Sequence, residues 1–159
     1  MAEPAGRPQF VHVVVGAGTA AGAIDIVNAC AFWNILYGTP PARILQAIAA
    51  GLLGKDSFAG GAATATLGLV LHFGMSLAMA AVFYCACLRW PPILRRPVIF
   101  GLLYGAITWL VMNQVVVPLS RAQPPPFIAA WFVDGVLVHL LLFGVMLALV
   151  ARWSASRPP

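Results

Sequence analysis

The residues from 127 to 151 form an almost unbroken apolar run, and such a run restricts the possible folds more than any other feature of this sequence. A helix needs about 20 predominantly apolar residues to cross the hydrocarbon core of a bilayer. Three runs of comparable length precede it, at residues 10–38, 62–88 and 98–119. We therefore expect four transmembrane helices.

The composition favours a membrane protein over a soluble one. Of the 159 residues, 62% are hydrophobic and 8% are charged, whereas a soluble domain is roughly half apolar and a quarter charged. A water-soluble fold of this size would lack the polar residues to cover such a chain. The expected fold class is all-α: one integral membrane domain over residues 1–159, built as a bundle of four transmembrane helices plus a short interfacial helix.

A shorter segment at residues 40–54 separates the first two spans. Pro40 and Pro41 suit the first turn of a helix, and Gly54 suits its end. Between them, apolar residues recur at helical spacing, but the segment is too short to span a bilayer. We favour a helix that lies along the membrane interface, and the alternative is a re-entrant segment that dips into the membrane.

Basic residues are distributed unequally between the two ends of the expected bundle. With four spans, the termini and the 89–97 loop share one side, which carries Arg7, Arg89, Arg95, Arg96, Arg152 and Arg157. The other side carries Arg43, Lys55 and Arg121. An excess of Lys and Arg marks the cytoplasmic side, so we expect both termini in the cytoplasm. The net charge of +5 arises from these flanks, with no basic cluster interleaved with aromatic residues, and nucleic acid is therefore not an expected partner.

Polar residues inside the expected spans are the candidates for an intramembrane site. They are Asp25, Asn28, His72, Asn113, Asp134 and His139. A charged group at the bilayer centre costs about 3 kcal/mol or more, so it normally faces a protein interior or a water-filled cavity. The helical rise places Asp25, His72 and His139 near the middle of their spans, and the other three in the outer halves. The antiparallel order of the spans makes contacts within each of these two layers possible.

Small residues mark the faces on which helices approach closely. Two spans carry glycines four residues apart, and the 62–88 span carries a stripe of Thr64, Gly68, His72 and Ser76 at the same spacing. Such small-xxx-small patterns are typical of helix contacts in membranes. The glycines expected at these contacts are Gly18, Gly22, Gly68, Gly101 and Gly105.

Three functions fit these residues. Polar residues in membrane helices often serve only as interhelical hydrogen-bond partners, worth about 0.6 kcal/mol on average. This favours a structural or stress-related membrane component, or a subunit of a membrane assembly. A carboxylate opposite a histidine can exchange a proton near neutral pH, which would suit a proton- or solute-conducting module. The third possibility is an electron carrier with a haem held between His72 and His139.

Motifs for catalysis or metal binding are absent from the sequence. It contains no HExxH, no GxSxG and no CxxCH for covalent haem attachment. We expect no enzymatic activity, no catalytic residues, no metal site and, apart from the haem alternative, no cofactor. The expected partners are the lipid bilayer and either a second copy of the chain or another membrane protein.

Several short segments share a pattern with a known group of proteins. They are residues 42–54, 58–61, 101–105, 109–113 and 117–120, together with His72 and the proline-rich loop before the last span. From about Gly18 onward, the chain resembles small bacterial inner-membrane proteins of the YagU-like type. The resemblance implies a four-span protein of the bacterial inner membrane and supplies no catalytic residues.

Overall fold

The computed structural model describes residues 6–123 and 127–157, and within these ranges all regular secondary structure is helical. Four helices are long and apolar enough to cross a membrane: Val11–Tyr37, Gly61–Arg89, Pro97–Leu119 and Ala129–Ala155. The prediction of an all-α bundle is therefore confirmed. By the length and composition of these helices, the chain is a multi-pass membrane protein.

Three of the four long helices are assembled from α-helical pieces and a π-helical stretch. The α-helical pieces are α1 (Gly18–Tyr37), α4 (Pro97–Val111), α5 (Val117–Leu119), α6 (Ala129–Leu137) and α7 (Met146–Ala155), whereas α3 (Gly61–Arg89) is α-helical throughout. The π-helical stretches are Val11–Ala17, Met112–Val116 and Val138–Val145. A π-helical turn takes up more residues than an α-helical one, so it changes which face the following side chains occupy.

The helix boundaries lie close to those expected from the apolar runs, and the last helix differs most. It covers Ala129–Ala155 instead of residues 127–151. Ile128 has an extended backbone, with φ −124° and ψ 113°, and this places the start after it. At the other end, Ala151 and Ala155 are both buried in the core, which holds the last turn against its neighbours.

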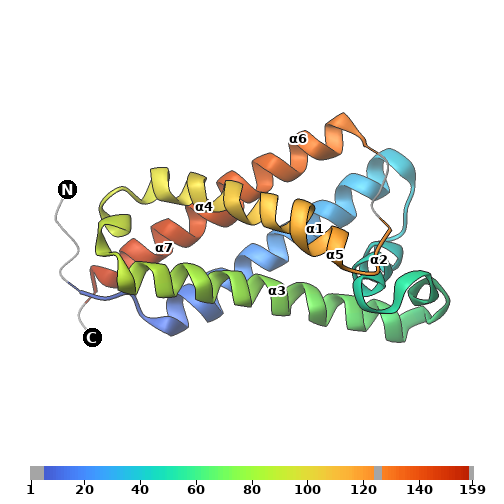
Figure 1. Ribbon diagram of the computed structural model, residues 1–159, viewed down its shortest axis with the longest axis horizontal. Coiled ribbons are helices and arrows are strands. Elements are labelled where there is room, and N and C mark those ends of the chain that lie inside the picture. The colour runs from blue at the N-terminus through green and yellow to red at the C-terminus, as the bar shows by residue number, and fades with distance from the viewer. Residues whose placement is uncertain (1–5, 124–126, 158–159) are drawn as a thin grey trace.

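The long helices run side by side along the longest axis of the molecule (Figure 1). Both termini and the connection between α3 and α4, a 3-10 turn at Pro91–Arg95, lie at one end, called here the terminal end. The hydrophobic core is gathered near this end: Val13, Ala17, Ala21, Ala80, Phe83, Cys87, Ile93, Leu94, Phe143, Leu147, Ala148, Ala151 and Ala155. Many of these side chains are alanines, and they allow the helix backbones to approach closely.

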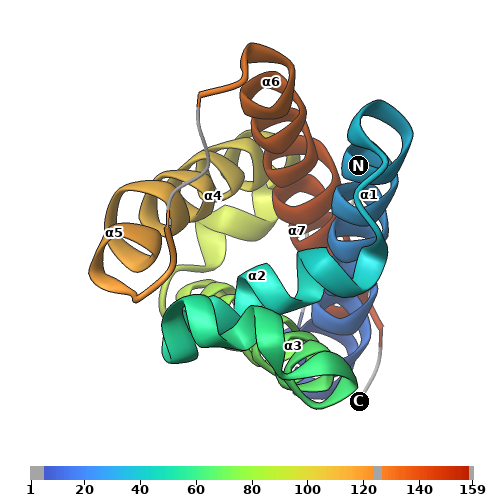
Figure 2. The same cartoon turned by 90° about the vertical axis from the view of Figure 1, so that its right-hand side faces the viewer.

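At the opposite end, called the far end, α2 (Pro41–Leu53) lies crosswise to the long helices (Figure 2). Gly54, with φ +65°, ends α2 and leads into a 3-10 turn at Gly54–Ala59. Arg121 holds the C-terminal end of α2, because its backbone N–H donates to Gly51 O at 2.9 Å and its guanidinium to Leu52 O at 3.4 Å. The crosswise position matches a helix that is too short to span a bilayer.

Candidate functional site

The contact between α1 and α3 is a regular antiparallel ladder of side-chain to backbone hydrogen bonds. The Nε2–H of His72 donates to Gly22 O at 2.8 Å, and the hydroxyl of Ser76 donates to Gly18 O at 2.7 Å. Both donors and both acceptors are four residues apart, so one face of each helix supplies both bonds. The stripe seen in the sequence of α3 thus meets the glycine pair of α1.

Glycine is required on the α1 side of this ladder. A Cβ built on Gly22 would lie 2.9 Å from Ser76 Oγ, and one on Gly18 would lie 2.9 Å from Ala80 Cβ. Any larger residue would push the helices apart and take the donors of α3 out of reach of the α1 carbonyls. Packing and hydrogen bonding at this contact therefore depend on the same two positions.

Asp25 lies one turn further along α1 and approaches the same histidine. Its Oδ2 is 3.9 Å from His72 Nε2, and the side chains of Asp25 and His72 are 30% and 14% exposed. Because the proton on Nε2 points at Gly22 O, the carboxylate adds an electrostatic contact and not a second short hydrogen bond. The structure therefore brings together the two members of the expected central layer that lie on α1 and α3.

A second polar contact joins α1 to α6. The amide of Asn28 donates to Asp134 Oδ2 at 2.7 Å, and both side chains are partly buried. This distance lies within the range of N–H···O hydrogen bonds in proteins. Since Asp25 and Asn28 are three residues apart, one face of α1 reaches α3 through the first residue and α6 through the second.

Asn113 does not join this cluster, although its depth suggested that it would. Its amide donates to Trp109 O in its own helix at 2.9 Å, and the residue is exposed. The buried face of α4 includes Thr108, and five residues correspond to a rotation of about 140° from that face. The rise along a helix fixes the depth of a side chain and leaves its direction undetermined.

His139 is likewise not placed with Asp25 and His72. Its Nδ1–H donates to Gly135 O in its own helix at 2.9 Å, and its ring stacks on Phe143. It follows Asp134 by five residues, which again turns the side chain by about 140° from the face that meets α1. A haem iron between the two helices would need one ring nitrogen from each histidine, and the Nε2 of His72 is bonded to Gly22 O on α1.

The five glycines expected at helix contacts all lie against a neighbouring helix. A Cβ on Gly68 would fall on Leu45 O of α2, and one on Gly101 would lie 2.7 Å from Val145 Cα. Gly105 faces the backbone at His139, and Gly18 and Gly22 face α3. Sequence reasoning missed Gly144, whose position would place a Cβ against Gly101 O.

A polar contact at the terminal end was also missed. His12 Nδ1 lies 3.0 Å from Ser154 Oγ, which accepts a hydrogen bond from the backbone N–H of Gln9 at 2.8 Å. The sequence offered one sign of this contact, because His12, the third histidine of the chain, lies inside the first apolar run. Ser154 lies beyond residue 151, where the last span was expected to end, so the expected span did not include the partner of His12.

The arrangement is suited to joining helices. Among residues 6–123 and 127–157, no group of three or more His, Cys, Asp or Glu side chains is placed to hold a metal ion. The two contacts that involve carboxylates, at Asp25 and at Asp134, are each made across a helix interface.

Comparisons of the chain with protein-family models, curated proteins and solved structures found no match.

Proposed function

We propose that the protein is a non-enzymatic component of a bacterial inner membrane, either a structural or stress-related part of it or a subunit of a larger membrane assembly. The observation that supports this proposal is that four polar residues inside the spans, Asp25, Asn28, His72 and Asp134, join one helix to another. Asn28 bonds Asp134, and His72 bonds the backbone of α1. Groups engaged in this way stabilise a scaffold.

The surface of the bundle supports the assembly part of the proposal. Only 17% of the apolar 18-residue stretch is buried within the molecule in α3, and the same fraction in the long helix Pro97–Leu119. The remaining faces of these helices are available to lipid, to a second copy of the chain or to another membrane protein. The excess of arginine at the terminal end supports an orientation with both termini in the cytoplasm.

The first experiment is cross-linking in native membranes, followed by purification in a mild detergent and measurement of the mass of the complex. We expect a mass above the 16.8 kDa of one chain, from a homo-oligomer or from a co-purifying membrane protein. A single chain with no cross-linked partner, in membranes and in detergent alike, would contradict the assembly role.

A proton-conducting module is the second candidate, and the observation that favours it is the 3.9 Å approach of Asp25 to His72. The test is pH-driven flux in liposomes that contain the native protein, Asp25→Asn or Asp134→Asn. The matched control is Asp56→Asn, since Asp56 lies in the exposed turn after α2. We expect no flux above that of empty liposomes. Flux that falls in Asp25→Asn and persists in Asp56→Asn would favour conduction.

The haem alternative is tested by the visible absorption spectrum of the purified protein. We expect no Soret band, because the Nε2 of His72 is bonded to Gly22 O on α1. A Soret band that is lost in both His72→Ala and His139→Ala would require a rearranged bundle and an electron-carrier function.

A further inference from the structure

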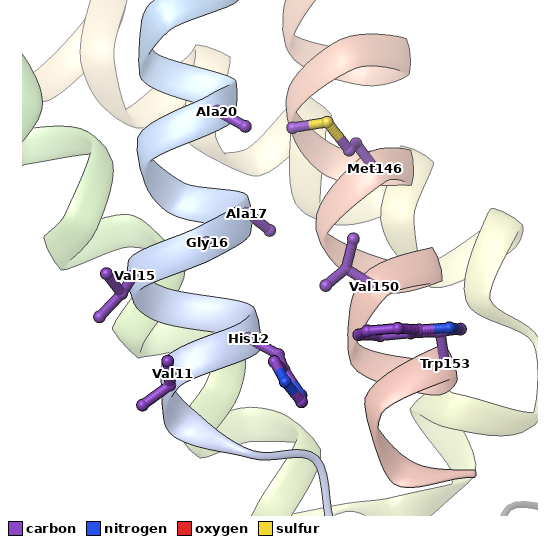
Figure 3. A pocket seen from close by; sticks show the side chains of 9 residues that line it. All are labelled: Val11, His12, Val15, Gly16, Ala17, Ala20, Met146, Val150 and Trp153. Atoms are coloured by element: carbon purple, nitrogen blue, oxygen red, sulfur yellow. The ribbon is translucent and has the colours of Figure 1, made fainter. Parts of the chain in front are cut away.

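A surface groove of about 400 Å³ lies between the first long helix and α7, at the terminal end (Figure 3). Its lining is almost wholly apolar: Val11, His12, Val15, Gly16, Ala17, Ala20, Met146, Val150 and Trp153. In the close-up, His12 and Trp153 lie at one end of the groove, and Ala20 and Met146 lie at the other. The groove is therefore apolar along its length, and the two side chains that carry ring nitrogens lie at one end.

The groove fits within one leaflet. Its α-helical wall rises about 10 Å from Met146 to Trp153, which is less than half of the roughly 30 Å hydrocarbon core. A docked transmembrane helix would need a contact surface across both leaflets. A single acyl chain of the leaflet at the terminal end would need no more than this groove.

The polar end of the groove is basic. The guanidinium of Arg157 lies over the Trp153 ring at 3.9 Å. Arg7 is exposed and lies on the segment held to α7 on both sides, by Gly6 N–H to Ala155 O at 3.1 Å and by the bond from Gln9 to Ser154. In the described part of the chain, the acidic residues are Asp25, Asp56 and Asp134, none of which lies at the terminal end.

We propose that this groove binds one anionic phospholipid of the leaflet at the terminal end. An acyl chain lies along Val15, Ala20 and Val150, and the phosphate is held by Arg7 and Arg157. The aromatic ring of Trp153 lies where tryptophan is enriched in membrane proteins, at the level of the headgroups. Such a site would exist whether or not the protein belongs to a larger assembly.

The test is a titration of the delipidated protein, followed by native mass spectrometry, with phosphatidylglycerol and with phosphatidylcholine of the same acyl chains. We expect phosphatidylglycerol to bind at least fivefold more tightly, and Arg157→Gln to weaken its binding about fivefold, the effect of one arginine near an anionic headgroup. The control is Arg96→Gln, an exposed arginine at the same end of the molecule, which should leave the affinity unchanged.

Substitutions that fill the groove test whether the acyl chain binds there. Ala20→Leu should weaken the binding of both lipids, and Ala78→Leu, at an exposed position of α3, should not. Val15→Phe repeats the test if Ala20→Leu does not fold. Equal affinity for the two lipids, equal losses in Arg157→Gln and Arg96→Gln, or no effect of filling the groove would each overturn the proposal. A change of oligomeric state in Ala20→Leu with lipid binding intact would identify the groove as a protein interface instead.

Discussion

At the scale of single residues, α1 is the helix on which the polar contacts depend. Asp25 and Asn28 are three residues apart, and they reach two different helices, at His72 and at Asp134. An unpaired polar side chain in hydrocarbon costs free energy. Each pair therefore favours the rotation of α1 about its axis that allows contact with both α3 and α6. The two contacts together fix the orientation of α1 between α3 and α6.

The energy of the second contact is open to measurement with a double-mutant cycle on Asn28→Ala and Asp134→Ala, in bicelles titrated with a denaturing detergent. We expect a coupling free energy of at least about 0.6 kcal/mol, the average for hydrogen bonds between membrane helices, and at most about 1.7 kcal/mol, the largest value found for them. Asn113→Ala combined with Asp134→Ala is the control cycle, because the Asn113 amide bonds its own helix. Its coupling should be near zero. Comparable couplings in both cycles would mean that the Asn28 bond adds no specific stability.

The sequence was sufficient to place these residues in depth and insufficient to orient them. Asp25 with His72, and Asn28 with Asp134, meet at the depths that the helical rise assigns to them. Asn113 and His139 are turned away, because a side chain's direction depends on how its helix rotates against its neighbours. The π-helical stretches at Met112–Val116 and Val138–Val145 also alter that rotation, and nothing in the composition of these apolar segments marks them as π-helical.

At the scale of helices, α2 and α3 cross where the backbone of one meets a glycine of the other. Gly68 leaves room for Leu45 O, and Gln46 adds a hydrogen bond from its side-chain amide to Gly61 O at 3.0 Å. The four-residue spacing of small residues on α3 was visible in the sequence. The first half of the stripe contacts α2, and the second half contacts α1. This division depends on the crosswise position of α2, which follows from the three-dimensional packing.

Substitution of this glycine should be costly. Gly68→Ala should lower the free energy of unfolding by about 1 to 3 kcal/mol, because α2 has to move to admit the methyl group. Gly74→Ala on the same helix meets nothing within 4 Å and should leave stability unchanged or raise it by up to about 1 kcal/mol, because alanine is the better helix former. Thermal unfolding in detergent checks both variants, and equal stability of Gly68→Ala and Gly74→Ala would contradict the close crossing.

At the scale of the whole molecule, the two ends of the bundle differ. The hydrophobic core and the arginine-rich flanks lie toward the terminal end, whereas α2 and the contact between Asn28 and Asp134 lie toward the far end. The number of spans and the end at which each connection lies could be read from the apolar runs. The position of the core could not, because the runs are apolar along their whole length.

The central claim is that the chain crosses the bilayer four times, with both termini on one side. The most direct measurement uses a variant in which Cys30, Cys85 and Cys87 are replaced by alanine. Single cysteines are then introduced as Lys55→Cys at the far end and as Arg96→Cys or Ser156→Cys at the terminal end.

Each variant is treated with a membrane-impermeant maleimide in inside-out vesicles. We expect Arg96→Cys and Ser156→Cys to be labelled at once, and Lys55→Cys only after the vesicles are opened. The reverse pattern would reverse the orientation and leave the four spans in place. Labelling of Lys55→Cys and Arg96→Cys from the same side would contradict the four-span bundle itself.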